Sequence, residues 1–579
     1  MRMLEIQRLG RLMAIPFLLA LAGTTLAQCP VGDAILPANP LNYPMTSDKY
    51  AVEYQVGAGP WTNARVYISY YGETTASPPR TDSGYTVGAT SLSFVSIPAV
   101  SNAAVRLRVT NLFEGGFQPS DRVSVRPSVR LIDVDTLRDG TVQITTTTAA
   151  NFAGEQFILW WNRGSDGGGV EGLAFYLNPP YTEPTGTNVK LVSSAADLTG
   201  DLTGIDTLDF ETTVDISAGG TMAYEVPSQI LNIFFGPNAW VKGKLRFDLA
   251  GTDANGVRLK RTIYGPGVLD VSLFNYENRA CVGTADEYYA LSSGSSVDLD
   301  RYTIDGLILT DINHAANHSF FNSKVNNMKV LGWNGENAAL RLGDNTVVTN
   351  VFIRSGDDSL MMWGSPVSVT NATVWQNYNG GVANLGWSDN SVGDGNSIDG
   401  LYVVKTDWLI PTSTSWTARN PDDHPLRGQN NAVFASLMVP TTVYGYKSPP
   451  VYKNIFVEDP PQVLFSIKIL PPICAPTGLT CPSVTLTQPS TLNLNIENLI
   501  SPPSIVPNSI GFQNVPDNYA GDGQPGFTLH GTMNIGLTNV FAKLDDGFLV
   551  PILNFDTPLI GTILTNGNVR VTYRFAPPK

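Results

Sequence analysis

A short pattern of apolar and polar positions recurs along the second half of the chain. Each copy has an apolar residue, any residue, an Asn or Gly, and a second apolar residue. The first five copies start 21, 23, 21 and 29 residues apart, and a period in this range indicates a repeat architecture. The copies lie at residues 304–307 (IDGL), 325–328 (VNNM), 348–351 (VTNV), 369–372 (VTNA), 398–401 (IDGL) and 452–455 (YKNI).

These units predict the rungs of a parallel β-helix. They contain short β-branched runs that alternate with polar residues, and they show no helical period. Asn and Gly suit the turns between such strands because both residues tolerate positive φ. Each rung contacts only its neighbours, so stacking the rungs produces a continuous core. We therefore expect an all-β chain in which residues 205–579 form a right-handed parallel β-helix.

The first part of the chain has a different pattern of predicted strands and turns. Strand-like runs at residues 65–70, 105–109 and 156–161 alternate with turn clusters, without the longer repeat. This spacing predicts an N-terminal β-sandwich over residues 28–204. Its Arg122, Arg126 and Arg130 are expected to be surface charges. An alternative is a carbohydrate-binding role for this part, with Trp160 and Trp161 presenting aromatic faces.

Residues 1–27 have the pattern of a secretory signal peptide. Arg2, Arg8 and Arg11 precede an apolar run from Leu12 to Ala22, and small residues precede Gln28. The run is too short to span a bilayer stably. No later segment has 18 consecutive apolar residues. We therefore expect a secreted, extracellular protein with no membrane contact after cleavage.

Composition narrows the possible partners. The formal net charge is −14 and the chain has no basic stripe, which argues against nucleic acid as a partner and favours a neutral glycan over a polyanion. The four cysteines allow three pairings, which stay open. We expect a monomer without a cofactor. His314 and His318 are spaced as a metal pair would be on a helix, but the rung pattern predicts a loop there, so no metal is assigned.

Three carboxyl groups fall one predicted rung apart. Glu336 precedes Asp357 by 21 residues and Asp358 by 22, and Trp333 and Trp363 flank them. Residues one rung apart lie side by side in a β-helix, so the three groups should share a face. Their mutual repulsion should raise at least one pKa, as a glycosidase that uses one carboxyl as acid and another as base requires. A solvated turn and a calcium-binding turn are the simpler interpretations of Asp357-Asp358.

The same stretch resembles known polysaccharide hydrolases. Asn334-Gly335-Glu336 followed by Asp357-Asp358 is similar to the catalytic arrangement of the polygalacturonase-type β-helix enzymes. The resemblance is closer to glycoside hydrolase family 49, the dextranase and isopullulanase family, whose members carry a β-sandwich before the β-helix. It rests on residues 240–243 (WVKG), 267–269 (GVL), 345–352 (NTVVTNVF), Asp357-Asp358 and Gly386-Trp387.

This resemblance implies an inverting glycoside hydrolase that cleaves the α-glucosidic linkages of a dextran- or pullulan-like polysaccharide. Asp357 would be the general acid, and Asp358 and Glu336 would hold and deprotonate the water. Sugar-binding roles fall on Trp333, Asn334, Trp363, Asn379 and Trp387.

Two departures accompany the resemblance. An ungapped comparison puts Ala338 where the family has its third catalytic Asp, so Glu336 takes that role only after a small shift. Asn379 and two glycines stand near the place of the polygalacturonase His-Gly.

Two alternatives stay open. One is a polygalacturonase-like hydrolase of an acidic or pentose polysaccharide, which needs Arg or Lys in the cleft. Lys329 and Arg354 are the nearest candidates in sequence. The other is a non-catalytic, glycan-binding β-helix adhesin, in which the three carboxylates would point apart.

Overall fold

The computed structural model describes most residues between Thr46 and Phe575. Outside the described residues lie 1–45, 71–90, 113–114, 131, 138, 164–171, 218–222, 249–250, 272–288, 294–298, 313, 317–318, 333–337, 379, 389–393, 409–430, 439–447, 462, 470–489, 504–509, 515–530, 545–546, 552–563, 567–568 and 576–579.

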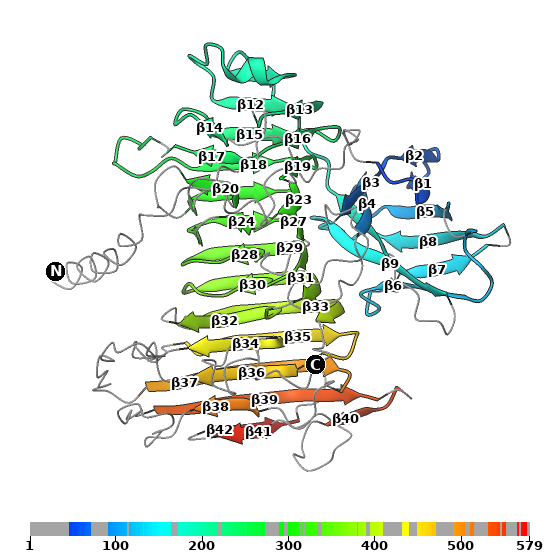
Figure 1. Cartoon of the computed structure of the whole chain (residues 1–579), viewed down its shortest axis with the longest axis vertical. Coiled ribbons are helices and arrows are strands. Elements are labelled where there is room, and N and C mark those ends of the chain that lie inside the picture. The colour runs from blue at the N-terminus through cyan, green and yellow to red at the C-terminus, as the bar shows by residue number, and fades with distance from the viewer. Residues whose placement is uncertain are drawn as a thin grey trace, which may run out of the picture.

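The described chain folds into two β-domains that pack side by side (Figure 1). The first domain has two five-stranded sheets, in which every pair is antiparallel except β4 with β10. One sheet is β2 (Thr62–Ala64), β1 (Tyr50–Val56), β5 (Ala104–Asn111), β8 (Thr141–Thr147) and β7 (Asp133–Thr136). The other is β3 (Val66–Tyr70), β4 (Ser91–Pro98), β10 (Gly172–Asn178), β9 (Glu155–Arg163) and β6 (Asp121–Arg126).

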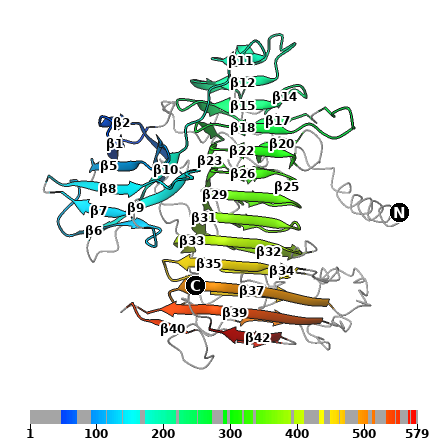
Figure 2. The same ribbon diagram turned by 180° about the vertical axis from the view of Figure 1, so that it is seen from behind.

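The second domain is a parallel β-helix whose longest sheet has 19 strands (Figure 2). Its early rungs contribute two short strands each, and from β29 onward these merge into one long strand per rung. In order, the strands are β11 (Val189–Val192), β12 (Thr207–Phe210), β13 (Thr213–Asp215), β15 (Asn232–Phe235), β16 (Trp240–Lys242), β18 (Arg261–Tyr264), β19 (Val268–Asp270), β22 (Tyr302–Asp305), β23 (Ile308–Ile312), β26 (Lys324–Asn326), β27 (Lys329–Gly332), β29 (Thr346–Ser355), β31 (Val367–Tyr378), β33 (Ser397–Trp408), β35 (Val451–Val457), β37 (Ser490–Ser501), β39 (Gly531–Lys543), β40 (Leu549–Pro551) and β42 (Val569–Arg574).

Shorter sheets complete the rungs, and one 3-10 turn, η1 (Ala195–Leu198), lies near the start of the β-helix. The upper sheets are β14 (Tyr224–Val226), β17 (Leu245–Phe247), β20 (Tyr289–Ser293) and β24 (His314–Ala316), with the pair β21 (Leu299–Asp300) and β25 (Phe320–Phe321). The lower sheet is β28 (Leu340–Arg341), β30 (Leu360–Met361), β32 (Ala383–Ser388), β34 (Ala432–Met438), β36 (Val463–Ile469), β38 (Ile510–Asn514) and β41 (Leu564–Asn566).

The repeat seen in the sequence marks one turn of every central rung. Its apolar positions point inward, as Val348 and Val351 do with 0% of each residue exposed. Its Asn or Gly has positive φ in every copy, as predicted, at Gly306, Asn327, Asn350, Asn371, Gly400 and Asn454. The amide of Asn371 donates to Asn350 on the rung before, so the turns are also tied to one another. The all-β prediction, with a sandwich followed by a β-helix, is therefore confirmed.

The β-helix begins before residue 205, where the sequence analysis places its start. Strand β11 already pairs in parallel with β12, matching Val189 with Thr207. The segment of residues 179–188 therefore connects the sandwich directly to the first strand of the solenoid.

Aromatic side chains form the apolar contact between the domains. Trp160 of the sandwich meets Trp375 of the β-helix edge-on, with ring centroids 5.6 Å apart. Trp161 points to the other face of its strand, into the sandwich core, where its indole N–H donates to the Tyr50 hydroxyl at 2.9 Å. The exposed fractions of Trp160 and Trp161 are only 7% and 4%, so these side chains cannot present faces to a sugar. The interpretation of this pair as a carbohydrate platform is wrong.

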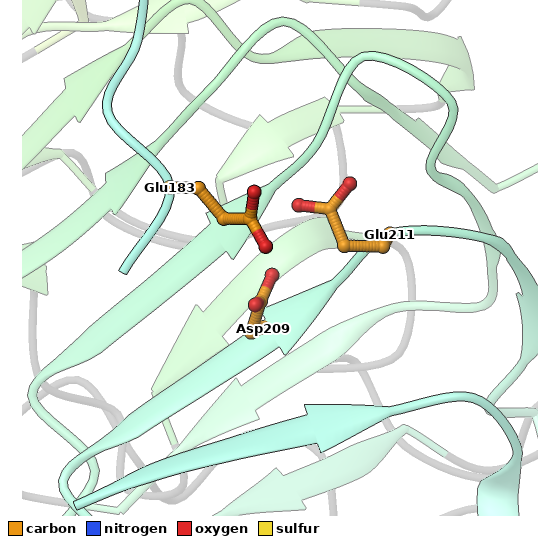
Figure 3. Close-up of side chains that lie close together, drawn as sticks. All are labelled: Glu183, Asp209 and Glu211. Atoms are coloured by element: carbon orange, nitrogen blue, oxygen red, sulfur yellow. The ribbon is translucent and has the colours of Figure 1, made fainter. Parts of the chain in front are cut away.

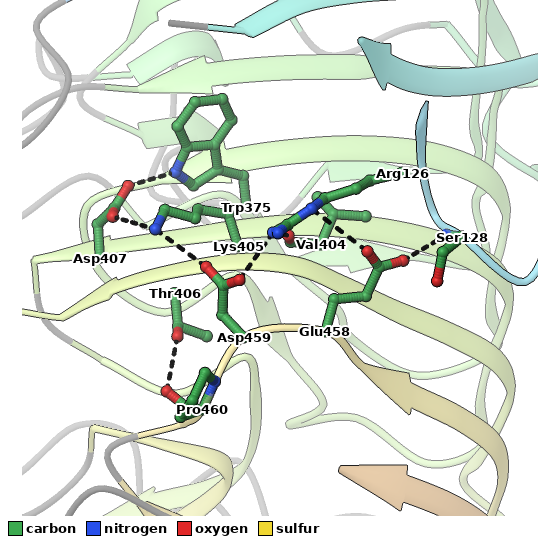
Figure 4. Close-up of polar contacts among 10 residues, drawn as sticks. All are labelled: Arg126, Ser128, Trp375, Val404, Lys405, Thr406, Asp407, Glu458, Asp459 and Pro460. Carbon is green, nitrogen blue, oxygen red and sulfur yellow. Dashed lines mark hydrogen bonds and ion pairs between the residues drawn. The ribbon is translucent and has the colours of Figure 1, made fainter. Parts of the chain in front are cut away.

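A charged network borders this apolar contact (Figure 4). Arg126 forms ion pairs with Asp459 at 2.8 Å and Glu458 at 3.4 Å, both in the β-helix domain. Lys405 pairs with Asp459 at 3.0 Å. A second arginine of the sandwich, Arg130, donates to Asn371 at 3.2 Å. Arg122 is exposed as expected, whereas the expectation of surface positions is wrong for Arg126 and Arg130, which hold the domains together.

Several sequence interpretations fall outside the described residues. They are the signal peptide over residues 1–27, His318, and the cysteines Cys29, Cys281, Cys474 and Cys481. His314 lies in β24 rather than in the loop that the rung pattern predicts. Within the described residues, no helix has the length and apolar content needed to cross a membrane.

Candidate active site

Asp357 and Asp358 lie at a corner of the β-helix. The chain bends between the end of β29 at Ser355 and the start of β30 at Leu360, two strands of different sheets. Neighbouring residues of a straight strand point to opposite faces, so two adjacent carboxyls can share a face only where the backbone leaves the strand. The bend meets that requirement. Asp357 is half-buried, and Asp358 is buried with 8% of its surface exposed.

Neutral donors hold the carboxyl of Asp358. The backbone N–H of Gly381 donates to Oδ1 at 2.7 Å, and the amide of Asn384 donates to Oδ2 at 2.6 Å. Burial raises the pKa of Asp358 to about 6, and these two hydrogen bonds oppose that rise. The group therefore changes charge close to neutral pH while its position stays fixed by donors on the next rung.

Two glycines on the next rung allow this close approach. Gly380 has φ +78°, and a Cβ there would lie 2.5 Å from Oδ1 of Asp357 and 2.4 Å from the backbone N of Asp358. A Cβ at Gly381 would lie 2.6 Å from the methyl group of Ala435. Any side chain at residue 380 would therefore push against both aspartates.

Hydroxyl groups inside the rung brace the bend. Ser355 donates to the carbonyl of Asp357 at 2.8 Å, and Gln376 donates to the same carbonyl at 2.9 Å. Ser359 donates to the side-chain oxygen of Gln376 at 2.6 Å. Because both sides of the bend are bonded to one buried glutamine, the backbone that carries the two carboxyls is rigidly supported.

Trp363 is linked to this carboxyl pair through one amide. Its indole N–H donates to Oδ1 of Asn384 at 3.3 Å, while the other end of the same amide holds Asp358. Trp363 is half-buried, and the guanidinium of Arg341 lies 4.6 Å from its ring centroid. A partly exposed indole beside a carboxyl pair suits stacking against a sugar ring.

The other predicted site residues are less completely placed. Glu336, Trp333, Asn334 and Asn379 lie outside the described residues, and Trp387 is described only as part of the backbone of β32. On the preceding rung, the N–H of Ala339 donates to the Asp358 carbonyl at 2.9 Å. The assignment of Glu336 and its neighbours therefore stays a prediction.

The two cations considered for an acidic substrate are both buried. Arg354 and Lys329 both have exposed fractions of 0%. Arg354 donates to the Gly332 carbonyl at 2.8 Å, and Lys329 donates to Asn178 of the sandwich. Burial lowers the pKa of Lys329 to about 7, which Asp305 partly offsets. The suggestion that these two side chains serve an acidic glycan is wrong.

Asn384 and Gly381, which the structure shows donating to the carboxyl of Asp358, were not predicted from the sequence. Each is a common residue whose role depends on which side chain lies across the rung boundary. The spacing held one signal, because Gly381 follows Asp358 by 23 residues, which is one rung step.

A β-sandwich packed on a parallel β-helix, with a braced carboxyl pair at a corner of the helix, defines the structural class of this chain. No protein-family model matches the chain. In sequence it is similar to the dextranase of Arthrobacter globiformis, with 23% identity over 349 residues, 50% of this chain and 50% of that protein. A dextranase of Talaromyces minioluteus is 25% identical over 194 residues, 31% of this chain and 29% of that protein.

Among solved structures, Dex49A from Penicillium minioluteum has a similar fold. The TM-score is 0.65 at 15% identity, covering 93% of this chain and 96% of that one. The resemblance to the glycoside hydrolase family 49 dextranases is thereby confirmed. The matched segment spans about half the length of the Arthrobacter relative.

Proposed function

We propose that this protein is a secreted glycoside hydrolase that cleaves the α-glucosidic linkages of dextran or a similar neutral glucan, with inversion. The observation that carries the proposal is the carboxyl pair at the β29–β30 corner, where Asp358 is held by Gly381 and Asn384 beside a partly exposed Trp363. Support comes from the dextranases that the chain resembles in sequence and from the family 49 enzyme that it resembles in fold.

In this proposal the two aspartates divide the chemistry. Asp357, the more accessible of the pair, protonates the glycosidic oxygen as the bond breaks. Asp358 orients and deprotonates the attacking water together with Glu336. The pKa of about 6 at Asp358 makes it a stronger base than an ordinary carboxylate, and its two neutral donors keep it in place when it is charged.

Sugar binding falls to aromatic and amide side chains. Trp363, Trp333 and Trp387 provide platforms for sugar rings, and Asn334 and Asn379 hydrogen-bond to hydroxyl groups. A neutral glucan needs no converging cations, and the net charge of −14 disfavours a polyanionic substrate. The acidic-glycan alternative would have to use Arg341, the cation described nearest to Trp363.

The experiment is a reducing-sugar screen of the purified protein against dextran, pullulan, arabinan and polygalacturonate. We expect release from dextran or pullulan, with proton NMR showing the β-anomer first. Cleavage of polygalacturonate alone would select the acidic-glycan alternative. Binding to a glycan without any cleavage would select the adhesin alternative, and an α-anomeric first product would contradict inversion.

Secretion and the monomeric state belong to the same proposal. The mature chain should begin near Gln28 and run as a single copy in size-exclusion chromatography. N-terminal sequencing of secreted material checks the first expectation, and material that still begins at Met1 would contradict it.

A further inference from the structure

A second group of carboxylates lies at the start of the β-helix, separate from the candidate active site. Glu183 comes from the segment that connects β10 to β11, Asp209 from β12, and Glu211 from the residue after that strand. Their carboxylates converge on one point (Figure 3), and the ligand oxygens all lie within 4.8 Å of one another.

Two of the three carboxyl groups each have a buried oxygen with no hydrogen-bond partner. Asp209 has an exposed fraction of 4%, and its Oδ1 accepts no hydrogen bond. Oε1 of Glu211 is buried in the same way. Among the residues that the structure describes, no Lys or Arg forms an ion pair with any of the three. A buried carboxylate oxygen with no donor is unfavourable, so it calls either for a proton shared between Asp209 and Glu211 or for a bound cation.

The backbone at Gly236, next to the three carboxylates, leaves room for the side chain of Glu211. The N–H of Gly236 donates to the Phe210 carbonyl at 2.7 Å, which brings residue 236 beside Glu211. A Cβ at residue 236 would lie 2.2 Å from Oε2 of Glu211. The glycine therefore lets the Glu211 carboxylate lie flat against the neighbouring rung and point toward Asp209.

Burial and the charges of neighbouring carboxyls also raise the pKa values of two of these groups. Burial, followed by the charges of Asp209 and Glu183 and a hydrogen bond shared with Asp209, raises the pKa of Glu211 to about 7. Burial and the charge of Glu183 raise the pKa of Asp209 as well. Carboxyls at an ordinary solvated surface show no such change, because water screens them.

We propose that Glu183, Asp209 and Glu211 bind a divalent cation that takes hard oxygen ligands, and we name Ca²⁺ as that cation. Three carboxylates supply only hard oxygen ligands, which Ca²⁺ prefers over softer donors. Ca²⁺ takes its oxygens at about 2.3–2.6 Å, so ligands on opposite sides of it are about 4.6–5.2 Å apart. Oxygens that lie within 4.8 Å of one another fit around such an ion.

Binding here would join two parts of the fold. Glu183 belongs to the connection between the domains, whereas Asp209 and Glu211 belong to the first rungs. A cation shared by the three would clamp the connection onto the β-helix and cap the start of the solenoid. This inference does not depend on the proposed hydrolase function.

The test uses the full mature chain treated with EDTA and then dialysed. Titration calorimetry with CaCl₂ should give one site per chain, and the melting temperature should rise when Ca²⁺ is added, because the ion binds only the folded form. Terbium provides a second probe, since Tyr264, whose pKa is raised by burial and by the charge of Asp209, can sensitise its emission. No calorimetric heat and no sensitised emission at millimolar cation would overturn the proposal. A response to Mg²⁺ that equals the response to Ca²⁺ would overturn the choice of Ca²⁺.

Variants separate a cation site from a merely acidic surface. Glu183→Gln changes an exposed residue and should leave the fold intact while weakening Ca²⁺ binding by at least about tenfold, because Ca²⁺ affinity depends on the number of charged ligands. Asp209→Asn should remove binding altogether. Asp201→Asn is the matched control, an exposed carboxyl of the same region that accepts from the Thr203 N–H at 2.8 Å, and it should bind as the wild type does. Equal binding by wild type, Glu183→Gln and Asp209→Asn would refute the assignment.

Discussion

Two clusters of acidic residues in this β-helix differ in the hydrogen bonds that their buried carboxyl oxygens accept. At the corner after β29, Asp358 receives hydrogen bonds from the Gly381 N–H and the Asn384 amide. At the first rungs, Asp209 and Glu211 each have a buried oxygen that accepts none. Neutral donors stabilise a carboxylate but leave it able to take up a proton, whereas an arrangement without donors calls for an ion. The difference separates a site suited to proton transfer from a site suited to a cation.

The largest expected effect is the loss of turnover at the corner. Asp357→Asn should lower kcat on the glucan that the wild type cleaves by about 10²–10⁴-fold, because an amide cannot protonate the departing oxygen. Asp358→Asn should be similarly severe, and the double variant should be little worse, since both groups serve one transition state. Substrate affinity should persist in each variant, as measured by binding to the uncleaved glucan.

The control for these variants is Asp344→Asn. Asp344 is an exposed carboxyl near the same rungs whose oxygen accepts from the Ser365 N–H at 2.8 Å. It should retain wild-type turnover. Near-normal turnover in both Asp357→Asn and Asp358→Asn would place the active site elsewhere.

A second prediction concerns a variant that removes a hydrogen-bond donor from the Asp358 carboxyl. One oxygen of that carboxyl then lacks a donor, as one oxygen each of Asp209 and Glu211 does at the first rungs. Asn384→Asp has the same shape but cannot donate to Oδ2 of Asp358, and it adds a negative charge 2.6 Å away. A hydrogen bond to a charged group is worth about 1.5–3 kcal/mol, so kcat should fall by about 10–100-fold. Because Asn384 acts through Asp358, the acidic limb of the pH profile should also move to higher pH. A fall in kcat without that movement would mean that Asn384 has another role.

The wild-type pH profile sharpens the comparison further. Asp358 must be ionised to accept a proton from water, and its pKa is raised to about 6 by burial. Its active form is therefore lost as the pH falls through about 6, so kcat/KM should drop about tenfold per pH unit below that value. A profile that stays flat down to pH 4.5 would show that Asp358 is not the base.

The smallest expected effect is a loss of stability at the domain contact, where the carboxyl groups already form ion pairs with Arg and Lys side chains. At the domain contact, Asp459 pairs with Arg126 at 2.8 Å and with Lys405 at 3.0 Å. Arg126→Met should lower the free energy of unfolding by about 1.5–3 kcal/mol, the value of a charge-assisted hydrogen bond. Urea denaturation measures it, with Arg106→Met as the control, because Arg106 donates to Gln55 on the exposed surface. Unlike the first rungs, this contact should show no response to added Ca²⁺.

Parts of the site could be predicted because they are local. If Asp357 and Asp358 share a face, the strand must be interrupted there, because adjacent residues of a straight strand point to opposite faces, and the corner before Leu360 provides that interruption. The one-rung spacing from Asp358 to Gly381 can be read from the sequence, but the role of Asn384 and Gly381 as donors cannot, because it depends on the exact stacking of one rung on the next. Glu183, in the connection between the domains, and Asp209, in the β-helix, are 26 residues apart, and no motif joins them.

The sequence by itself determined the architecture of the β-helix. A repeat of buried apolar pairs with Asn or Gly between them specifies a turn with positive φ, as at Asn350 and Asn371, and repeated turns of this kind make a solenoid. Only the tertiary structure decided which faces the two domains bury. Trp160 and Arg126 lie in strands whose sequences do not show that they face another domain. In the structure, Trp160 contacts Trp375 of the β-helix, and Arg126 forms an ion pair with Asp459. The physical reason is that strand periodicity fixes which side chains share a face, whereas the partner of that face depends on how separate sheets pack.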